Sequence, residues 1–249
     1  MNIIKLILIS ILFNSLFPLS GIELAQLIND RQSPKDMKSN MSMVLTNKNG
    51  KMRTSSIRSY STNGNKKQIL WFLAPAEDKG VAYLKIEHED KNDDMKLWLP
   101  NFKKVRRISS RKKTESFMGS DMSYEDMTSR NMDEYSYSIS GSEKVNDIDC
   151  YILESIPNGI KTEYSKHISW ITKDSHLSVK EESFDKKGVL LKNKSIIYQQ
   201  IKMYYIMKEL NVKNVQRNHQ TVLKFDKIQV DSGIEDNIFH EKNLKRIPK

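Results

Sequence analysis

The most chemically distinctive segment of this sequence is a basic run between Lys103 and Lys113. Seven of its eleven residues are cations: Lys103, Lys104, Arg106, Arg107, Arg111, Lys112 and Lys113. Positive charges at this spacing repel one another unless other charges offset them. One interpretation is a solvated rim. The other is a docking surface for anionic headgroups or an acidic partner, at about 1 kcal/mol per basic residue near a charged surface.

Three carboxylates follow the basic run closely, at Asp121, Glu125 and Asp126. Carboxylates grouped in this way suit cation binding or acid–base chemistry. A simpler interpretation is a solvated acidic face, or a partner that offsets the neighbouring cations. We favour the simpler interpretation over a cation-binding or acid–base site.

Methionine and aromatic side chains flank the basic run on both sides. Met95, Leu97, Trp98 and Leu99 precede the run, and Phe117, Met118 and Met122 follow it. The chain contains 12 methionines. Such residues usually form a packed core. Because thioethers are flexible and polarisable, the same composition also suits a cavity for irregular apolar ligands such as acyl chains. Binding there would scale at ~0.8 kcal/mol per buried CH₂.

The sequence contains no catalytic or metal-binding pattern. Its 5 histidines are dispersed, and no HExxH, G-x-S-x-G, Walker or G-x-G-x-x-G pattern occurs. The single cysteine, Cys150, cannot close an intrachain disulfide or build a cysteine-rich metal site. We therefore expect no catalytic residue, no metal and no cofactor. A secreted hydrolase is the weaker alternative, since it would need a nucleophile–base pair that is not visible.

The first residues have the layout of a secretory signal peptide. Lys5 precedes an apolar run over residues 6–13, and the small residues Ser20 and Gly21 follow Pro18. The run is far shorter than the ~20 residues that cross a bilayer, and no cysteine follows it to accept a lipid anchor. We expect residues 1–20 to be removed and the rest of the chain to be exported without lipidation. Export argues against nucleic acid as a partner, despite the net charge of +10.

Strand patterns dominate the rest of the chain. A helix is predicted at Ile22–Arg31, followed by about ten strand-like runs separated by turn signals. Ile69–Ala74 is continuously apolar, which predicts a strand buried on both faces; Glu134–Ser140 alternates apolar and polar residues; and Val189–Met207 reads as one run. Because no βαβ alternation or compositional break is visible, we expect one mainly β domain over residues 21–249.

Three blocks resemble the outer-membrane lipoprotein-sorting protein family, relatives of the periplasmic carrier LolA. They are Asp93–Pro100 (DDMKLWLP), Lys103–Ser110 (KKVRRISS) and Ser116–Asp126 (SFMGSDMSYED). Phe225–Val230, with Gly233–Phe239, is similar to the family's closing strand and tail. Two positions depart from the pattern: Met122 stands where an aromatic residue is expected, and Lys96 places a charge in an apolar segment.

The resemblance implies a LolA/LolB-like fold. This fold is a single strongly curved antiparallel sheet, an incomplete β-barrel, with a few short helices covering the open side and a hydrophobic cavity between them. The resemblance also implies a periplasmic carrier of acyl chains, from a branch often associated with RND-type exporters.

Taken together, these patterns predict a monomeric, non-enzymatic periplasmic carrier that binds acyl chains of lipoproteins or lipids and delivers them toward the outer membrane. The apolar ligand contacts are expected from Trp71, Leu97, Leu99, Phe117, Met118, Met122, Tyr135 and Tyr137. Lys103, Lys104, Arg106 and Arg107 are expected to dock a membrane or a transporter. The alternative is an accessory interaction protein of an RND-type exporter that carries no lipid.

Overall fold

The computed structural model describes residues 19–248 and begins with a short helix, α1 (Gly21–Asn29). Its first turn is stabilised by a capping box, in which the Ser20 hydroxyl accepts from the Glu23 amide while the Glu23 carboxylate accepts from the Ser20 amide. The predicted leader, residues 1–20, falls outside the described residues except for Leu19 and Ser20. Among the described residues, every helix is too short or too polar to cross a membrane.

Within residues 19–248, the strands form one antiparallel sheet of 13 strands. Their bounds are β1 (Asp36–Thr46), β2 (Met52–Thr62), β3 (Lys67–Ala74), β4 (Ala82–Ile86), β5 (Asp94–Leu99), β6 (Lys104–Arg107), β7 (Tyr135–Val145), β8 (Ile148–Pro157), β9 (Tyr164–Thr172), β10 (Ser178–Asp185), β11 (Leu190–Ile201), β12 (Tyr204–Asn214) and β13 (His219–Val230). Short 3₁₀ helices are η1 (Pro100–Phe102), η2 (Ser110–Lys112), η3 (Met132–Glu134), η4 (Asp236–Phe239) and η5 (Glu241–Lys245).

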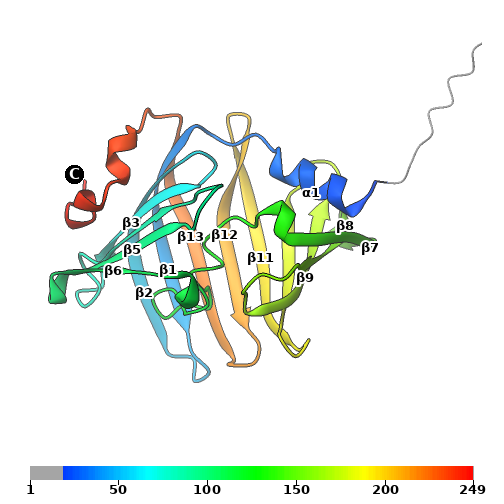
Figure 1. Cartoon of the computed structure of the whole chain (residues 1–249), viewed down its shortest axis with the longest axis horizontal. Coiled ribbons are helices and arrows are strands. Elements are labelled where there is room, and N and C mark those ends of the chain that lie inside the picture. Colours follow the sequence, from blue (N-terminus) through cyan, green and yellow to red (C-terminus); the bar gives the residue numbers. More distant parts are fainter. Residues whose placement is uncertain (1–18, 249) are drawn as a thin grey trace, which may run out of the picture.

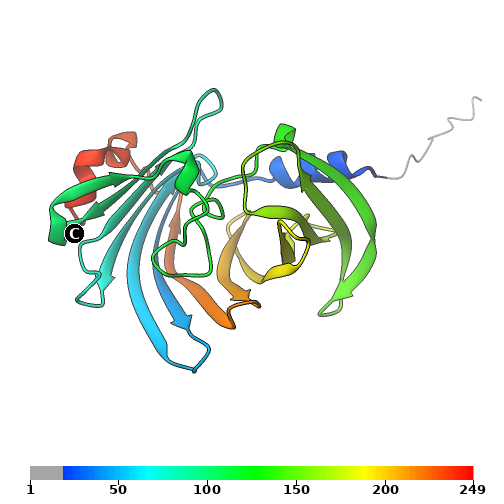
Figure 2. The same cartoon turned by 60° about the horizontal axis from the view of Figure 1, so that its bottom comes forward.

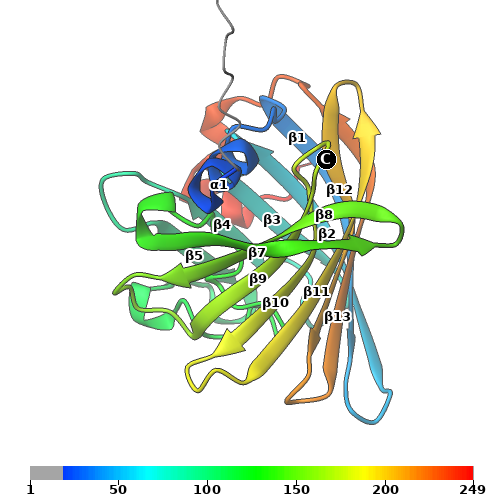
Figure 3. The same ribbon diagram turned by 90° about the vertical axis from the view of Figure 1, so that its right-hand side faces the viewer.

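The order of the strands decides how the chain is routed. Strands pair with their sequence neighbours except that β1 pairs with β13, so the strands from the two ends of the chain lie in the middle of the sheet (Figure 1). The edges are β6 and β7, which are consecutive in sequence and lie at opposite ends of a sheet that does not close on itself (Figure 1). Figure 3 looks onto the β7 end of this sheet. Residues 108–131 must therefore run from one edge to the other. They do so over the concave, inner face, and we call them the crossing segment (Figure 2).

Strand β3 shows how one strand serves two clusters. Two groups of buried apolar side chains pack on opposite faces of β3, and we call them the inner cluster and the outer cluster. Leu70 and Phe72 belong to the inner cluster, Ile69 and Trp71 belong to the outer cluster, and all four side chains are fully buried. Successive side chains point to opposite faces of a strand, so the continuous apolar run is explained by a sheet covered on both sides. The prediction of a doubly buried strand is confirmed.

Different parts of the chain cover the two faces. On the outer face, Phe239 of η4 and Leu244 of η5 complete the outer cluster over β3 and β4. Helix α1 packs on β7 and β8, where its Leu24 meets Leu153 and Ile171. The crossing segment contributes Phe117 to the inner cluster, together with Met122 and Tyr124. An irregular segment, rather than an α-helix, thus covers much of the inner face.

The described residues form 13 strands where about ten were expected, and one of the additional strands arises because a predicted run is a hairpin. Residues 189–207 turn at Lys202 and Met203, between β11 and β12. Lys202 adopts a left-handed backbone conformation, with a φ of 55°. That conformation is normally signalled by glycine or asparagine, and neither residue marks this turn.

Candidate functional site

The first part of the crossing segment forms an apolar lid on the inner face of the sheet. The Phe117 ring packs against Tyr83 of β4 and Phe72 of β3, with ring centroids 5.2 and 6.2 Å away. The Tyr124 ring meets Phe117 edge-on at 5.7 Å. Met122 is buried in the same cluster. Beneath the lid, the sheet supplies an apolar floor from the inner faces of β1 to β5, β12 and β13, namely Met41, Met43, Leu45, Ile57, Leu70, Phe72, Tyr83, Met95, Leu97, Val212 and Leu223.

The middle of the crossing segment is tied to β13 through Asp121. Its amide donates to the Thr221 hydroxyl over 2.8 Å, and that hydroxyl is 2.7 Å from the Asp121 carboxylate. Nδ1 of His219 lies 2.8 Å from the same carboxylate. These contacts hold the segment against the centre of the sheet.

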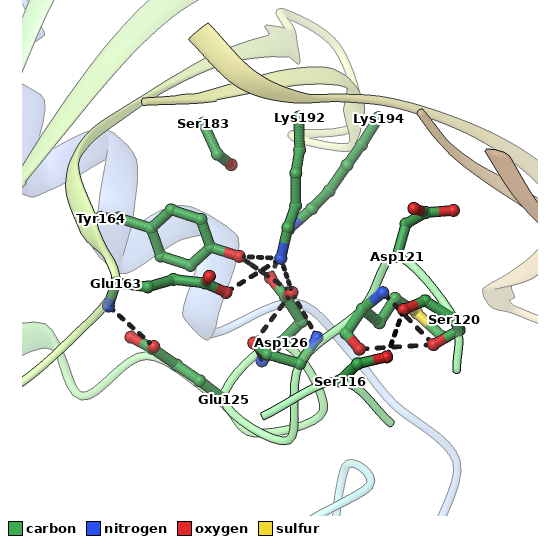
Figure 4. Close-up of polar contacts among 12 residues, drawn as sticks. Ser116, Ser120, Asp121, Glu125, Asp126, Glu163, Tyr164, Ser183, Lys192 and Lys194 are labelled. Atoms are coloured by element: carbon green, nitrogen blue, oxygen red, sulfur yellow. Dashed lines mark hydrogen bonds and ion pairs between the residues drawn. The ribbon is translucent and has the colours of Figure 1, made fainter. Parts of the chain in front are cut away.

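Farther along, Asp126 meets two lysines on β11 (Figure 4). Nζ of Lys192 lies 2.8 Å from one of its carboxylate oxygens and Nζ of Lys194 lies 2.9 Å from the other. The Tyr164 hydroxyl on β9 donates to the same carboxylate over 2.9 Å. Lys192 and Lys194 are two positions apart in β11, so both point to the inner face. The two ammonium groups and the Tyr164 hydroxyl thus converge on one carboxylate, that of Asp126.

Further ion pairs extend this contact into a network. Arg130 forms two parallel hydrogen bonds of 2.8 Å with Glu181 on β10, the bidentate geometry that makes such pairs strong. Lys194 reaches Glu181 over 3.0 Å and Lys192 reaches Glu163 over 2.9 Å. We call these six residues the inner ionic network. Its three cations balance its three carboxylates: Lys192, Lys194 and Arg130 against Asp126, Glu163 and Glu181.

The network lowers the pKa values of Asp126 and Glu181, and the pKa of the adjacent His167 is lowered as well. Burial acts to raise the pKa of Asp126, but the ammonium groups of Lys194 and Lys192 outweigh it and hold that pKa far below its usual range. Burial is likewise outweighed at Glu181, where Arg130 and Lys194 hold the pKa well below normal. At the adjacent His167, burial and the Arg130 charge lower the pKa to about 3. Asp126 and Glu181 are therefore charged and His167 is neutral near pH 7.

The favoured interpretation of the acidic residues as a solvated face or a partner of the basic run was wrong. The Asp121 and Asp126 side chains are almost fully buried, and Asp126 pairs with lysines more than sixty positions away in sequence. The reason lies in the topology, since the crossing segment brings these carboxylates under the inner faces of β11 and β13. Burial and the hydrogen bond from the Glu163 amide act in opposite directions on Glu125, and burial prevails, so its pKa is raised.

The basic run lies at the opposite end of the sheet, on Lys103 directly after η1, on β6 and on the start of the crossing segment. Arg106 pairs with Glu115 at 2.5 Å, and Arg107 with Asp94 at 3.2 Å. Lys103 and Lys104 are exposed and form no ion pair with any residue that the structure describes. Beside them the Phe102 side chain is 71% exposed. The tip of the β5–β6 connection thus presents one aromatic ring and two free cations.

Comparisons with known proteins place this geometry in a family. A family model described as an uncharacterized protein matches residues 64–246. An outer membrane lipoprotein-sorting protein domain from Vibrio parahaemolyticus is 32% identical, with a TM-score of 0.86, over 91% of this chain and 98% of that chain. The chain belongs to the outer-membrane lipoprotein-sorting protein family. A search of curated proteins gives no match.

Two further structures agree with this family membership. A DUF1329 family protein from Desulfovibrio piger is 32% identical over 90% of this chain and 97% of that chain, with a TM-score of 0.84. A LolA superfamily protein from Nitrosomonas europaea is 17% identical over 90% and 99% of the two chains, with a TM-score of 0.71. At that identity the likeness concerns the fold alone. This chain therefore has a LolA-like fold, as the resemblance implied.

Within this LolA-like fold, the eight expected ligand contacts fall into three places. Leu97, Leu99, Phe117, Met118 and Met122 belong to the inner cluster. Tyr135 and Tyr137 lie on β7, with ring centroids 6.3 Å apart, and Tyr137 packs against the α1 cluster. Trp71 lies on the outer face and donates its indole N–H to the Asn243 carbonyl over 3.0 Å. The structure thus brings five of the eight residues together and places Trp71 on the other side of the sheet, because alternate residues of β3 point to opposite faces.

Side chains of the crossing segment cover the apolar floor of the inner face. Phe117 and Met122 are at most 4% exposed. The two best-defined pockets among residues 19–248 have volumes of 190 and 160 Å³, and neither is lined by the inner cluster. Ligand pockets commonly measure ~300–1,000 Å³. In this conformation, neither pocket has the size of an acyl-chain cavity.

Sequence reasoning missed the inner ionic network. Lysines are normally solvated, so Lys192 and Lys194 gave no indication of burial. One signal was present: the strand of residues 178–185 carries charged or hydroxyl side chains at both alternating positions, for example Glu181 and Ser183 on one face and Lys180 and Glu182 on the other. A strand without an apolar face indicates that its inner side packs against polar groups.

Proposed function

We propose that this protein is an exported periplasmic carrier that binds acyl chains of lipids or lipoproteins on the inner face of its sheet and delivers them toward the outer membrane. The observation that carries the proposal is the apolar floor, rich in methionine and aromatic residues, under a segment that has no regular strand pairing with it. The lipoprotein-sorting relative supports it. In this proposed role the protein binds and carries its ligand without catalysing a reaction.

In this proposal, the crossing segment must move away from the floor before an acyl chain can bind. It is held by side-chain contacts at Asp121, Asp126 and Arg130 and by the packing of Phe117. Each CH₂ of an acyl chain that replaces those contacts gains ~0.8 kcal/mol. Leu97, Leu99, Phe117, Met118 and Met122 are the proposed contacts. Tyr135 and Tyr137 extend the surface toward β7, and Trp71 serves the packing of the C-terminal segment.

Delivery is proposed to begin at the tip of the β5–β6 connection. Lys103 and Lys104 supply unpaired positive charge, and Phe102 supplies an exposed ring that suits the headgroup region of a bilayer. Arg106 and Arg107 contribute less, because acidic neighbours already offset them.

A test combines lipid analysis with a matched pair of variants. Protein purified from a periplasm is extracted for mass spectrometry of bound lipid, and uptake of a fluorescent fatty acid is then titrated. Met118→Glu places a charge beside the inner cluster and is expected to reduce uptake by about tenfold, whereas Met52→Glu, at an exposed methionine of β2, is expected to match wild type. Absence of both lipid and uptake in wild type would overturn the proposal.

The small pockets favour a second candidate function. With its inner face filled, the protein would act as an interaction partner of an RND-type exporter's periplasmic domain and carry no lipid. A pull-down with a variant carrying Glu at positions 103, 104, 106 and 107 separates the two candidates. Loss of exporter binding with intact fatty-acid uptake assigns docking and cargo to different surfaces, whereas exporter binding without any uptake favours the second candidate.

A further inference from the structure

The carboxylate of Asp126 occupies a position that the sheet prepares for an anion. Nζ of Lys192, Nζ of Lys194 and the Tyr164 hydroxyl lie 2.8, 2.9 and 2.9 Å from its oxygens. All three donors belong to the sheet, on β9 and β11, whereas Asp126 belongs to the crossing segment (Figure 4). The donors and their anion are thus carried by different parts of the fold.

The charge balance of the inner ionic network changes when the part of the crossing segment that carries Phe117 and Asp126 leaves while Arg130, near the β7 end of the segment, stays paired with Glu181. With Asp126 present, three cations face three carboxylates, so the network is neutral. Without Asp126, the same three cations face only Glu163 and Glu181, which leaves one positive charge in excess. Lys192 is only 4% exposed, and an uncompensated buried charge is strongly unfavourable. An anion at the vacated position would restore the balance.

A second observation indicates unused hydrogen-bonding capacity at this place. The His167 ring packs on Tyr164 with centroids 4.6 Å apart, and its side chain is 1% exposed. Nδ1 pairs with the Ser183 hydroxyl at 2.9 Å, whereas Nε2 has no hydrogen-bond partner among the described residues. Buried polar atoms of this kind are normally satisfied. An oxyanion bound among these groups would offer an acceptor near this ring.

The same movement of the crossing segment uncovers an apolar surface. Phe117, nine positions before Asp126, covers the methionine and aromatic floor of β1 to β5. Displacement of the segment would expose the apolar floor and the three donors together. The molecule that matches both surfaces has a hydrocarbon chain and an anionic headgroup.

We propose that Lys192, Lys194 and the Tyr164 hydroxyl bind the anionic headgroup, a phosphate or carboxylate, of a lipid, and that Asp126 occupies this site until the lipid displaces it. This proposal rests on the proposed carrier function and names its ligand class. Ammonium groups bind phosphate and carboxylate as point charges without a fixed geometry. One site can therefore accept either the internal carboxylate or the external headgroup.

The experiment compares extraction of phosphatidylglycerol and of diacylglycerol with identical acyl chains from neutral vesicles. Wild type is expected to prefer phosphatidylglycerol by about tenfold, since only that lipid carries a phosphate. Asp126→Asn removes the competing charge and is expected to increase phosphatidylglycerol extraction by about a further tenfold. Asp121→Asn is the matched control, because it loosens the same segment at β13 without freeing the lysines.

A charge-balanced double variant tests the donors themselves. Asp126→Asn with Lys194→Gln leaves two cations against two carboxylates, and it is expected to lose the gain seen in Asp126→Asn. Near-UV circular dichroism and thermal melting check that each variant is folded. If a variant fails to fold, the headgroup preference of the wild-type protein still decides the proposal.

The outcomes separate this inference from the proposed function. Equal extraction of both lipids by wild type, or equal gains for both lipids in Asp126→Asn, overturns the headgroup site while the carrier function stands. Extraction of neither lipid by any protein overturns both. Calorimetry with inorganic phosphate distinguishes the source of the anion: binding to Asp126→Asn as tight as that of phosphatidylglycerol would assign the site to a free anion and overturn a lipid headgroup.

Discussion

At the scale of single residues, the inner face is unusual because it carries a buried ionic network beside its apolar cluster. Lys192 and Asp126 are buried to the same degree as the apolar cluster beside them. Desolvation of such groups costs several kcal/mol per ion, and it is offset only when every partner is in place. Each side chain of the inner ionic network therefore depends on the others.

Removing one cation should expose this dependence. Lys192→Met leaves Glu163 without its cation and Asp126 with Lys194 as its one remaining cation of the network, and it should lower the free energy of unfolding by about 3–5 kcal/mol in urea titrations. Lys180→Met on β10 is the control, because that lysine side chain is 36% exposed and pairs with Glu182 at 3.0 Å. Its effect should stay within about 1 kcal/mol. Equal effects of the two substitutions would contradict a cooperative network.

His167 should give the protein a measurable pH dependence. Its pKa is about 3 in the folded protein and 6.5 in an unfolded chain, because burial, Arg130 and Lys194 disfavour the imidazolium. Between these values the unfolded state binds more protons, so stability falls as pH falls, by at most about 1.4 kcal/mol per pH unit. His167→Asn should flatten the dependence of unfolding free energy between pH 6.5 and about 4.5. A pH 8 measurement isolates its packing cost, and an unchanged slope would contradict this account.

The carboxylates of the network should act in a lower pH window. The pKa values of Asp126 and Glu181 lie well below their usual 3.8 and 4.5. Their stabilisation is therefore complete above about pH 5 and is lost as pH falls further. This order of loss distinguishes the histidine from the carboxylates in one titration.

At the scale of elements, α1 is held against β7 by a very close backbone approach. A Cβ on Gly21 would lie 2.5 Å from the carbonyl carbon and oxygen of Tyr137. Because those atoms belong to the backbone, the helix would have to shift.

Gly21→Ala should therefore lower the free energy of unfolding by about 1–3 kcal/mol, measured by urea titration. Gly141→Ala, later in β7, is the matched control, since the nearest atom to its Cβ would be Ile152 Cδ1 at 4.0 Å. We expect less than about 0.5 kcal/mol there. A Gly21→Ala protein as stable as wild type would show that α1 is not anchored by this contact.

The elements also show what was predictable from the sequence. Apolar alternation predicted strands such as β7, and continuous apolarity predicted the doubly buried β3, because both signals are local. The hairpin at Lys202 was missed because its left-handed conformation carries no glycine or asparagine signal.

The candidate site was only partly predictable for a similar reason. Leu97, Leu99, Phe117, Met118 and Met122 were recognised from composition and resemblance, and they do cluster. The partners of Asp126 lie on strands that meet it only through the crossing of residues 108–131 over the sheet. No local pattern encodes such a pairing, since it depends on which strands form the edges.

At the scale of the whole molecule, opposite ends of one sheet serve different tasks in the proposed function. The inner ionic network lies over β9 to β11, whereas the exposed tip with Phe102 lies at the β6 edge. A carrier with this arrangement would meet a membrane with its apolar and basic tip and keep the anion site away from it.

Docking at the tip should respond to the lysines more than to the arginines. Lys103→Gln with Lys104→Gln removes two unpaired cations and should weaken co-sedimentation with anionic vesicles by about thirtyfold at low salt. Arg106→Gln with Arg107→Gln should change it by less than about threefold, since Glu115 and Asp94 already offset those charges. Added salt should weaken binding of wild type. A larger effect of the arginines would place the docking surface elsewhere.

The central claim is that hydrocarbon binds on the inner face after the crossing segment moves. The most direct measurement is photo-crosslinking of the purified protein with a photoactivatable fatty acid, followed by peptide mapping. The account predicts adducts on peptides that contain Leu97, Phe117 and Met122, reduced by an excess of unlabelled fatty acid. Absence of competable adducts, or adducts confined to the outer face around Trp71, would contradict it.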